Sequence, residues 1–353
     1  MARPGAARYR GVMPTTDQLR EIATRVGVSL STVYRVLNGD IKGKRKDNAE
    51  KAQQIRTIAH ELGYRPNAAA KAMSSGRFNC VALLLSADYG RDFLHKGAFE
   101  GIQDALQERS MHLAVARVHD AQLHDPFGGP RFLTEWMSDG LLINYGDDVP
   151  RELLHLIHEQ EVPAVWLNVD LAFDTVSFDD HGAAFQATRH VIQLGHSDIY
   201  YAQYHESAHY STAARRAGYQ KAMQEAGLRS RVIHPPGGIK PADRFAFTRT
   251  WLAKDPRPTA VVGYGPEDAM NVASGALANG LTIPDDLSIV AIHDEVLDRN
   301  GFVYTTAVVD THQAGLQAVA MLLEKIKQPQ LQIPLVTIPY RLVPGLTTAK
   351  PKA

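Results

Sequence analysis

The 353-residue chain has almost no cysteine and no long apolar run, and both shortages narrow the class of protein. Its one cysteine, Cys80, excludes an intrachain disulfide framework and is typical of proteins from a reducing compartment. Cys80 begins a strand-like apolar run, so we expect a buried and unreactive thiol. No apolar segment of signal-peptide or membrane-spanning length follows the basic N-terminus, and we therefore expect a cytoplasmic protein.

The chain also lacks net charge, because two opposite excesses cancel. Residues 1–77 carry 15 Lys and Arg against 6 Asp and Glu, whereas residues 78–353 carry 23 against 32. A basic head on an acidic body predicts a polyanionic partner for the head alone. Because contacts with phosphates release counterions, we expect that binding to weaken steeply as the salt concentration rises.

A segment near the N-terminus has the pattern of two short helices around a tight turn. Apolar residues recur at helical spacing over residues 19–26, Gly27 permits the turn, and Ser29 is a suitable N-cap for the next helix. The apolar stripe of that second helix lies within residues 33–37. Its outward face then consists of Leu30, Ser31, Thr32, Tyr34 and Arg35. A helix-turn-helix presents such residues to base edges in the major groove of DNA.

The rest of the basic head predicts a third helix and a short conditional one. The third helix should cover about residues 48–62, after a basic loop over residues 40–47 that could lie along phosphates. Pro66 can begin a further helix over residues 67–73, which is Ala-rich and too short to stay helical alone in water. A helix that needs a partner in order to form is suited to coupling two events.

From residue 79 onward, short apolar runs alternate with amphipathic segments. Such alternation predicts parallel sheets with right-handed crossovers, whose ligands bind at the carboxyl ends of the strands. The expected strands cover residues 81–85, 112–116, 140–143, 164–167, 199–202, 260–262 and 287–292, and the expected helices cover residues 97–109, 151–161, 183–194, 213–226, 245–254 and 267–279.

Residues 18–76 resemble the DNA-binding headpiece of the lactose-repressor (LacI) family of bacterial transcription regulators. The matching pieces are Ile22-Ala23, Gly27-Val28-Ser29, Thr32-Val33, Arg35-Val36-Leu37-Asn38, Leu62-Gly63-Tyr64-Arg65-Pro66-Asn67 and Ala70-Lys71-Ala72-Met73. A weaker, collinear similarity continues to about residue 345. The resemblance implies an all-α helix-turn-helix headpiece followed by an α/β effector domain, which has parallel sheets and the two-lobed fold of periplasmic binding proteins.

The resemblance also implies domain boundaries. We expect a disordered basic arm over residues 1–15, the headpiece over 16–65, and a hinge helix with linker over 66–77. The effector-binding and dimerisation domain should span residues 78–346, followed by a tail over 347–353. Its first lobe is expected at about residues 78–196 and 308–338, and its second lobe at about 197–307 and 339–346.

Roles for single residues follow from the matched positions of the family. The expected base contacts are Leu30, Ser31 and Arg35, the expected backbone contacts are Arg20, Ser29, Thr32 and Asn38, and the expected hinge contacts in the minor groove are Ala70 and Met73. A guanidinium can bond guanine O6 and N7 together, which suits Arg35. Met73 replaces the usual hinge leucine and is apolar enough to wedge into a base step.

The effector cleft departs from the family pattern in two places. Gly265-Pro266 replaces a frequent Asn-Asp pair, and His293 replaces a frequent aspartate at the end of a strand. Both are positions where the family often binds sugar hydroxyls, so a sugar is not the only effector to consider. The candidate effector-binding residues are Asp88, Tyr89, Phe93, Arg215, Tyr264, His293 and Asp294.

Two catalytic motifs are present in part, and we interpret neither as an active site. The segment from His205 through Glu206 to His209 matches H-E-x-x-H, a zinc-protease pattern that needs both histidines on one helical face. It directly follows a strand-like run, so we expect a loop without a metal ion. Gly263-Tyr264-Gly265 lacks the third glycine of a dinucleotide fingerprint. We expect neither an enzyme nor a cofactor, and a metallohydrolase using His205, Glu206 and His209 is a weaker alternative.

The sequence as a whole favours a DNA-binding transcription regulator, with repression preferred to activation. Its expected partners are a pseudo-palindromic double-stranded operator, a small polar effector in the cleft between the lobes, and a second copy in a homodimer or dimer of dimers. No membrane partner is expected. A solute-binding protein without gene control is the other alternative. The identity of the effector, the operator sequence, and the choice between inducer and co-repressor stay open.

Overall fold

The computed structural model describes residues 15–37, 46–65, 72, 76–88, 94–123, 137–146, 149–235, 237–299 and 301–352. The chain divides into two compact units, Met1–Phe78 and Asn79–Ala353, which are described separately.

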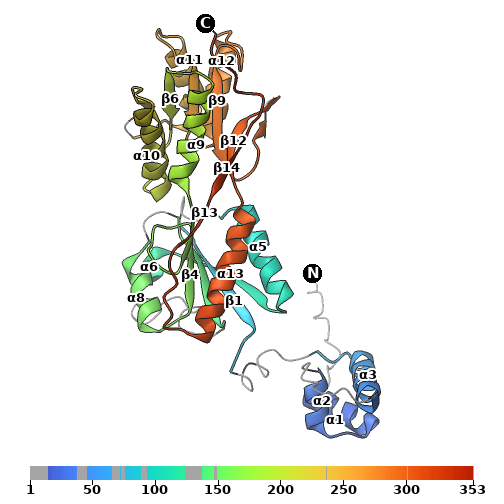
Figure 1. Ribbon diagram of the computed structural model, residues 1–353. Coiled ribbons are helices and arrows are strands. Elements are labelled where there is room, and N and C mark those ends of the chain that lie inside the picture. Colours follow the sequence, from blue (N-terminus) through green and yellow to red (C-terminus); the bar gives the residue numbers. More distant parts are fainter. Residues whose placement is uncertain are drawn as a thin grey trace, which may run out of the picture. The chain divides into compact units, whose positions relative to one another are not determined.

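The first unit is the helical headpiece, and its described helices pack around one small core (Figure 1). These helices are α1 (Thr15–Val26), α2 (Leu30–Leu37) and α3 (Lys46–Glu61). Each contributes one fully buried side chain, namely Ile22, Val33 and Ile55. Burial of a side chain of this size stabilises a fold by about 1.5–3 kcal/mol. The core therefore fixes the two helices around the turn, and a helix-turn-helix is confirmed.

The second unit contains two α/β lobes, and the first lobe is built on a parallel sheet. Its described strands lie in the order β13-β5-β4-β3-β1-β2. Helices α5 and α13 cover one face side by side (Figure 1). Gly101 and Gly315 lie where the two helices meet, and a Cβ at either would collide with the backbone of the other helix. The elements are β1 (Cys80–Ser86), α5 (Lys96–Glu108), β2 (His112–Val118), α6 (Asp120–Leu123), β3 (Gly140–Asn144), α8 (Arg151–Glu159), β4 (Ala164–Leu167), β5 (Thr175–Phe178), α13 (Thr311–Lys327) and β13 (Val336–Ile338).

The second lobe repeats this plan with one antiparallel strand. Its described strands lie in the order β14-β12-β9-β8-β6-β7, and β14 runs antiparallel to β12. Helices α9 and α10 pack together, as do α11 and α12 (Figure 1). The elements are α9 (Asp180–Gln193), β6 (Ile199–Ala202), α10 (Tyr210–Glu225), β7 (Arg231–Ile233), η1 (Pro241–Asp243), α11 (Arg244–Leu252), β8 (Ala260–Gly263), α12 (Pro266–Ala278), β9 (Ser288–His293), β10 (Asp298–Arg299), β11 (Phe302–Val303), β12 (Thr305–Val309) and β14 (Tyr340–Val343).

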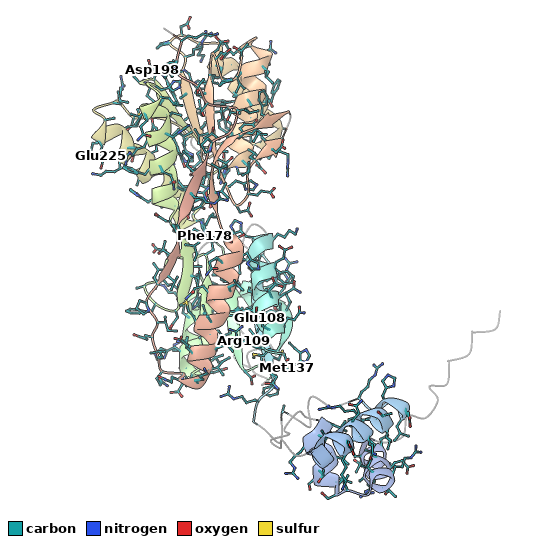
Figure 2. The ribbon with its side chains drawn as sticks, turned by 45° about the vertical axis from the view of Figure 1, so that its right-hand side comes forward. Glu108, Arg109, Met137, Phe178, Asp198 and Glu225 are labelled. Atoms are coloured by element: carbon teal, nitrogen blue, oxygen red, sulfur yellow. The ribbon has the colours of Figure 1, made fainter. Side chains whose placement is uncertain are left out.

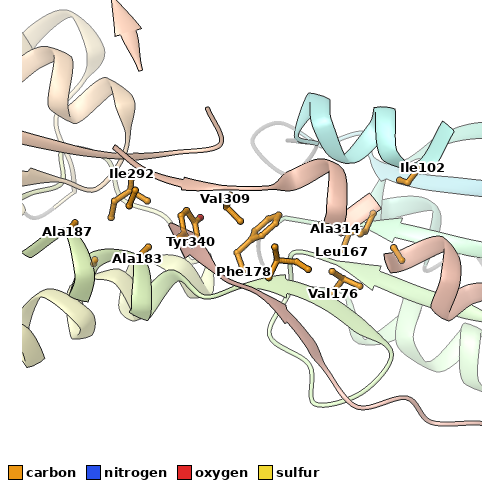
Figure 3. Close-up of a cluster of buried hydrophobic side chains, with 14 of the residues drawn as sticks. Ile102, Leu167, Val176, Phe178, Ala183, Ala187, Ile292, Val309, Ala314 and Tyr340 are labelled. Carbon is orange, nitrogen blue, oxygen red and sulfur yellow. The ribbon is translucent and has the colours of Figure 1, made fainter. Parts of the chain in front are cut away.

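Within the described residues, the chain passes between the lobes at Asp179, Asp310 and Pro339. The first of these positions differs from the expected boundary near residue 196. Helix α9 packs on strands of the second sheet, so the first lobe ends with β5 and not after α9. An amphipathic helix shows which of its faces is buried but not which sheet covers that face. Phe178, Val309 and Tyr340 lie in one apolar cluster that continues through both lobes (Figure 3).

The segment that we expected to form a tail is part of the second lobe. The backbone N–H of Ile289 donates to the carbonyl of Thr347 at 2.7 Å, and the Thr347 hydroxyl donates to the carbonyl of Ile289 at 2.6 Å. His196 Nε2 donates to the carbonyl of Ala349 at 2.8 Å. Residues 347–349 therefore extend along β9, where these hydrogen bonds hold them. No helix in the described part of the chain is long and apolar enough to cross a membrane.

Candidate nucleic-acid interface and ligand site

The start of α2 presents an exposed polar surface with one apolar side chain. Ser29 caps the helix, because its Oγ accepts a hydrogen bond from the Thr32 backbone at 3.2 Å and lies 2.9 Å from the Ser31 hydroxyl. Leu30 is 42% exposed although the headpiece core is close. Because the N-terminus of a helix carries a partial positive charge, this surface suits contact with phosphate as well as with base edges.

Two arginines flank this surface. Arg35 is exposed in the last turn of α2, and Arg20 is exposed on α1, where it lies 3.7 Å from Asp17. Both guanidinium groups can therefore reach a partner outside the chain without a rearrangement of the core. The expected contacts that the described headpiece contains are Arg20, Ser29, Leu30, Ser31, Thr32 and Arg35. All of them are exposed except Thr32, which is half-buried.

Tyr34 differs from the expected outward position. Its side chain is half-buried and packs against the headpiece core. Tyr64 packs against the same core, and burial together with the neighbouring Tyr34 raises the pKa of Tyr64. Asn38, Ala70 and Met73 lie outside the described residues, and their roles stay predictions.

In the second unit, the carboxyl ends of the two sheets face each other. Asn168 follows β4 of the first lobe, and its carbonyl accepts a hydrogen bond from His209 Nε2 of the second lobe at 3.0 Å. The side-chain oxygen of Asn168 accepts another from Tyr210, also at 3.0 Å. His95 of the first lobe lies 2.9 Å from Asp294, which follows β9 of the second. This is where ligands of parallel sheets bind, so both lobes can contribute to one site.

Arg215 is held in the second lobe by a set of internal contacts. Its Nε donates to Asp180 at 2.6 Å, its Nη1 donates to the carbonyl of Tyr264 at 2.6 Å, and its Nη2 donates to the Tyr340 hydroxyl at 3.0 Å. The guanidinium also lies over the rings of Tyr264 and Tyr340, at 4.7 and 5.9 Å from their centroids. A ligand would therefore meet an arginine whose position is already fixed.

Tyr264 joins a polar cluster at the carboxyl ends of β6 and β8. Its hydroxyl lies 2.7 Å from Ser211 Oγ, and its ring meets the edge of His205 at 4.7 Å between centroids. His209 caps α10, because its Nδ1 accepts from the Ser211 backbone. The sequence marked His209 only through the H-E-x-x-H pattern, and no motif selected Ser211, whose place beside Tyr264 depends on the fold.

The H-E-x-x-H segment lacks the helical geometry that a zinc-protease site needs. The H-E-x-x-H segment lies mainly in a loop, and α10 begins only at Tyr210, so His205 and His209 do not share a helical face. In the described ranges, no group of three or more His, Cys, Asp or Glu side chains could hold a metal ion. His209 is also occupied on both ring nitrogens, by Asn168 and by Ser211.

Carboxylates of the second lobe are already bonded within the chain. Asp268 is buried and accepts from the backbone N–H groups of Tyr204 and Gly265, at 2.8 and 3.2 Å. Burial raises the pKa of Asp268 to about 6. Asp294 lies 2.8 Å from His293 and 2.9 Å from His95, and these hydrogen bonds hold the pKa of Asp294 well below its usual range. Each oxygen of both carboxylates therefore already has one partner within the chain.

In the described part of the second lobe, four buried polar atoms lack a hydrogen-bond partner, and one of them is the Tyr304 hydroxyl before β12. The other three are the hydroxyls of Tyr201 and Thr212 and the Nε of Arg216, on β6 and α10. The Arg216 Nη2 donates to Gln203, which directly follows β6, at 3.3 Å. An unsatisfied buried polar group costs about 1–3 kcal/mol, so each of these atoms favours a bound water or ligand atom.

Asp88 lies at the corresponding end of the first sheet. Its carboxylate accepts from the Asp120 backbone at 2.9 Å and lies 3.0 Å from His119 Nδ1. These hydrogen bonds lower the pKa of Asp88. Tyr89 and Phe93, which follow it, lie outside the described residues, and their part in ligand binding stays a prediction.

Comparison with known proteins gives the same two domains. The family described as bacterial regulatory proteins, lacI family, matches residues 18–67, and the periplasmic binding protein-like domain matches residues 188–348. The chain is 26% identical to the HTH-type transcriptional regulator RegA of Clostridium saccharobutylicum, over 92% of this chain and 97% of that protein. It is 27% identical to the HTH-type transcriptional repressor PurR of Pectobacterium carotovorum, over 87% of this chain and 90% of that protein.

Solved structures share the fold. The Lac repressor dimer bound to operator and the anti-inducer ONPF superposes with a TM-score of 0.74 at 21% identity, over 94% of this chain and 98% of that one. The complex of the transcriptional regulator CelR with cellobiose superposes with a TM-score of 0.63 at 22% identity, over 93% of this chain and 99% of that one. The expected fold class is therefore confirmed.

Proposed function

This chain belongs to the LacI family of bacterial regulatory proteins, and from this premise we propose that it is a sequence-specific transcription repressor under the control of a small polar ligand. The observation that carries the proposal is the exposed surface at the start of α2, held in place by the headpiece core. Its relatives are transcription regulators and not enzymes. We infer a cytoplasmic protein, since its target is chromosomal DNA.

The α2 surface reads the operator. Arg35 bonds a guanine in the major groove, Leu30 contacts a thymine methyl, and Ser31 bonds a further base edge. Arg20, Ser29, Thr32 and Asn38 contact the phosphate backbone and fix the register of α2. Ala70 and Met73 of the hinge enter the minor groove and kink the DNA there.

Two copies of the chain bind one operator. A twofold dimer places two recognition helices about one helical turn of DNA apart, which predicts a pseudo-palindromic site. The solved Lac repressor complex is a dimer on its operator. We propose the same arrangement here, as a homodimer or a dimer of dimers.

The ligand binds between the carboxyl ends of the two sheets. Arg215 and Tyr264 form the fixed wall of the second lobe, next to His293 and Asp294, and Asp88, Tyr89 and Phe93 belong to the first lobe. Arg215 offers guanidinium N–H donors at a fixed position, and Arg216 Nε is a buried donor of the same helix that still lacks a partner. The effector therefore carries hydrogen-bond acceptors, and a sugar-like or other polar metabolite fits.

Selection of genomic DNA fragments by the purified protein at moderate salt tests this function. We expect one enriched pseudo-palindrome, whose neighbouring genes would name the pathway of the effector. The same selection with Arg35→Ala should lose the enrichment at one base in each half-site. Binding that is sensitive to salt but enriches no site would contradict a specific repressor, and the absence of any DNA binding would favour a solute-binding protein.

A further inference from the structure

One carboxylate is shared by histidines from both lobes. Asp294, which follows β9 in the second lobe, lies 2.9 Å from Nδ1 of His95 in the first lobe through its Oδ2. Its other oxygen lies 2.8 Å from Nδ1 of the neighbouring His293. The side chains of His95 and Asp294 are each 19% exposed, so solvent screens this interlobe bridge only in part.

The interlobe bridge lies next to the positions where the chain passes between the lobes. The His95 ring meets the edge of Phe178 at 5.3 Å between centroids, and Phe178 meets Tyr340 at 6.5 Å. Figure 3 shows Phe178 and Tyr340 on the strands that join the lobes. A cavity of about 300 Å³ borders Asp294, and its other lining residues include those of the second crossing, residues 308–312. Because His95 and Asp294 belong to different lobes, a rotation of one lobe against the other changes the distance between them.

Other charged groups lie near the bridge. Those in the described residues pair with a group of their own lobe or line the cavity that borders Asp294. Glu295 pairs with Arg299 at 3.5 Å, and Lys96 with Glu100 at 3.3 Å. His293 Nε2 lies 4.0 Å from Glu295. At the start of α13, Asp310 caps the helix through Gln313, and His312 lies 2.9 Å from Asp104. The exposed Arg341 of β14 lines the cavity.

We propose that the His95–Asp294 bridge makes the arrangement of the lobes depend on pH, so that protons act on the same switch as the effector. This inference rests on the proposed function for its biological meaning. Histidine is the side chain whose charge changes between about pH 5 and 8. A charged His95 imidazolium forms both an ion pair and a hydrogen bond with the Asp294 carboxylate. A neutral His95 imidazole forms only the hydrogen bond, which is the weaker interaction. Low pH therefore favours the lobe arrangement in this structure, and high pH weakens the bridge that holds the lobes in that arrangement.

The first test measures the lobes without DNA. Spin labels at Glu108→Cys and Glu225→Cys, both exposed and on different lobes, report the interlobe distance in a Cys80→Ser background (Figure 2). We expect the distance distribution to shift between pH 5.5 and 8.5 in the otherwise unchanged full-length chain. His95→Gln should abolish the shift, and so should Asp294→Asn.

His312→Gln is the matched control. His312 and Asp104 form the same kind of pair at the same 2.9 Å distance, but both belong to the first lobe. This variant should keep the full pH response. A shift of equal size in His95→Gln, or no shift in the unchanged chain, would overturn the proposal.

The second test measures operator affinity at the same pH values. Coupled sites typically alter each other's affinity by about fivefold or more, so we expect at least that change across this range, and its loss in His95→Gln. The two readouts separate the two proposals. If the selection yields no operator, the repressor function fails while the distance measurement still decides the bridge. If the operator binds with an unchanged pH profile in His95→Gln, the function stands and the bridge fails as a regulator.

Discussion

Arg215 and Asp180 form a buried ion pair, with 2.6 Å between Nε and Oδ1 and side-chain exposures of 14% and 1%. Asp180 begins α9 directly after the first crossing between the lobes, and Tyr340, which accepts from the same guanidinium, follows the third described crossing. Arg215 therefore ties α10 of the second lobe to two of the segments that connect the lobes. A ligand that moved Arg215 would move those segments with it.

Arg215→Leu should destabilise the effector domain by about 3–5 kcal/mol, because it leaves the Asp180 carboxylate buried without its cation. Chemical denaturation followed by circular dichroism measures this loss. The double variant with Asp180→Asn should recover part of it, since no charge is then left unpaired.

Arg231→Leu is the matched control for this prediction. Arg231 pairs with Asp198 at 3.0 Å, but the two side chains are 28% and 45% exposed. Solvent screens a surface pair of this kind, so its loss should change the stability far less than the loss of the buried pair. Equal losses in Arg215→Leu and Arg231→Leu would show that Arg215 has no special structural role.

Arg35→Ala should cost about 1–3 kcal/mol of operator binding and relax specificity at one base of each half-site. The reason is that a bidentate contact with guanine discriminates against every other base at that position. Competition binding with single-base operator variants measures the effect. Arg25→Ala, which removes an exposed arginine paired with Glu21 on α1, should leave base preference unchanged. Unaltered discrimination in Arg35→Ala would refute the role in base reading.

Met73→Gly should weaken binding to the operator more than binding to unrelated DNA. An apolar wedge gains its contacts only where the hinge enters a kinked minor groove, whereas non-specific binding depends mainly on phosphate contacts. Parallel titrations with operator and with a scrambled duplex of equal length measure the two losses. Equal losses on both duplexes would count against the wedge.

The sequence predicted most elements of the fold because their apolar patterns are strong. All residues of β3 are buried, and its sequence is a nearly continuous apolar run. The missed elements include helix α13 and the strands β5, β7, β10, β11, β12, β13 and β14. Of these, β5 and β13 are short, contain polar residues, and pair with each other. The position of α9 was misjudged for a related reason, as its sequence does not tell which sheet it covers.

The two candidate sites differ in how far apart their residues lie in the sequence. The α2 surface follows from consecutive residues, so Leu30, Ser31 and Arg35 could be placed from spacing alone. The role of Asp294 depends on His95, which is 199 residues away, and no pattern in the sequence joins them. Asp294 was expected to bind the ligand, and the structure shows that its carboxylate also bridges the two lobes through His95.

Asp268→Asn should remove a pH dependence from the stability of the effector domain. The folded-state pKa of Asp268 is raised from 3.8 to about 6, so the stability from this group is present below about pH 4 and is lost as pH rises through 6. A shift of this size corresponds to about 3 kcal/mol. Relative to the variant, the unchanged chain should therefore lose about that much free energy of unfolding between pH 4 and 7.5.

Urea unfolding of both proteins at several pH values measures this difference. Asp298→Asn, which alters an exposed aspartate of β10, controls for the change of charge. The asparagine at 268 can accept from only one of the N–H groups of Tyr204 and Gly265, and this adds a cost that does not vary with pH. A difference between the unchanged chain and Asp268→Asn that stays constant from pH 4 to 7.5 would show that the carboxylate is ionised at ordinary pH despite its burial.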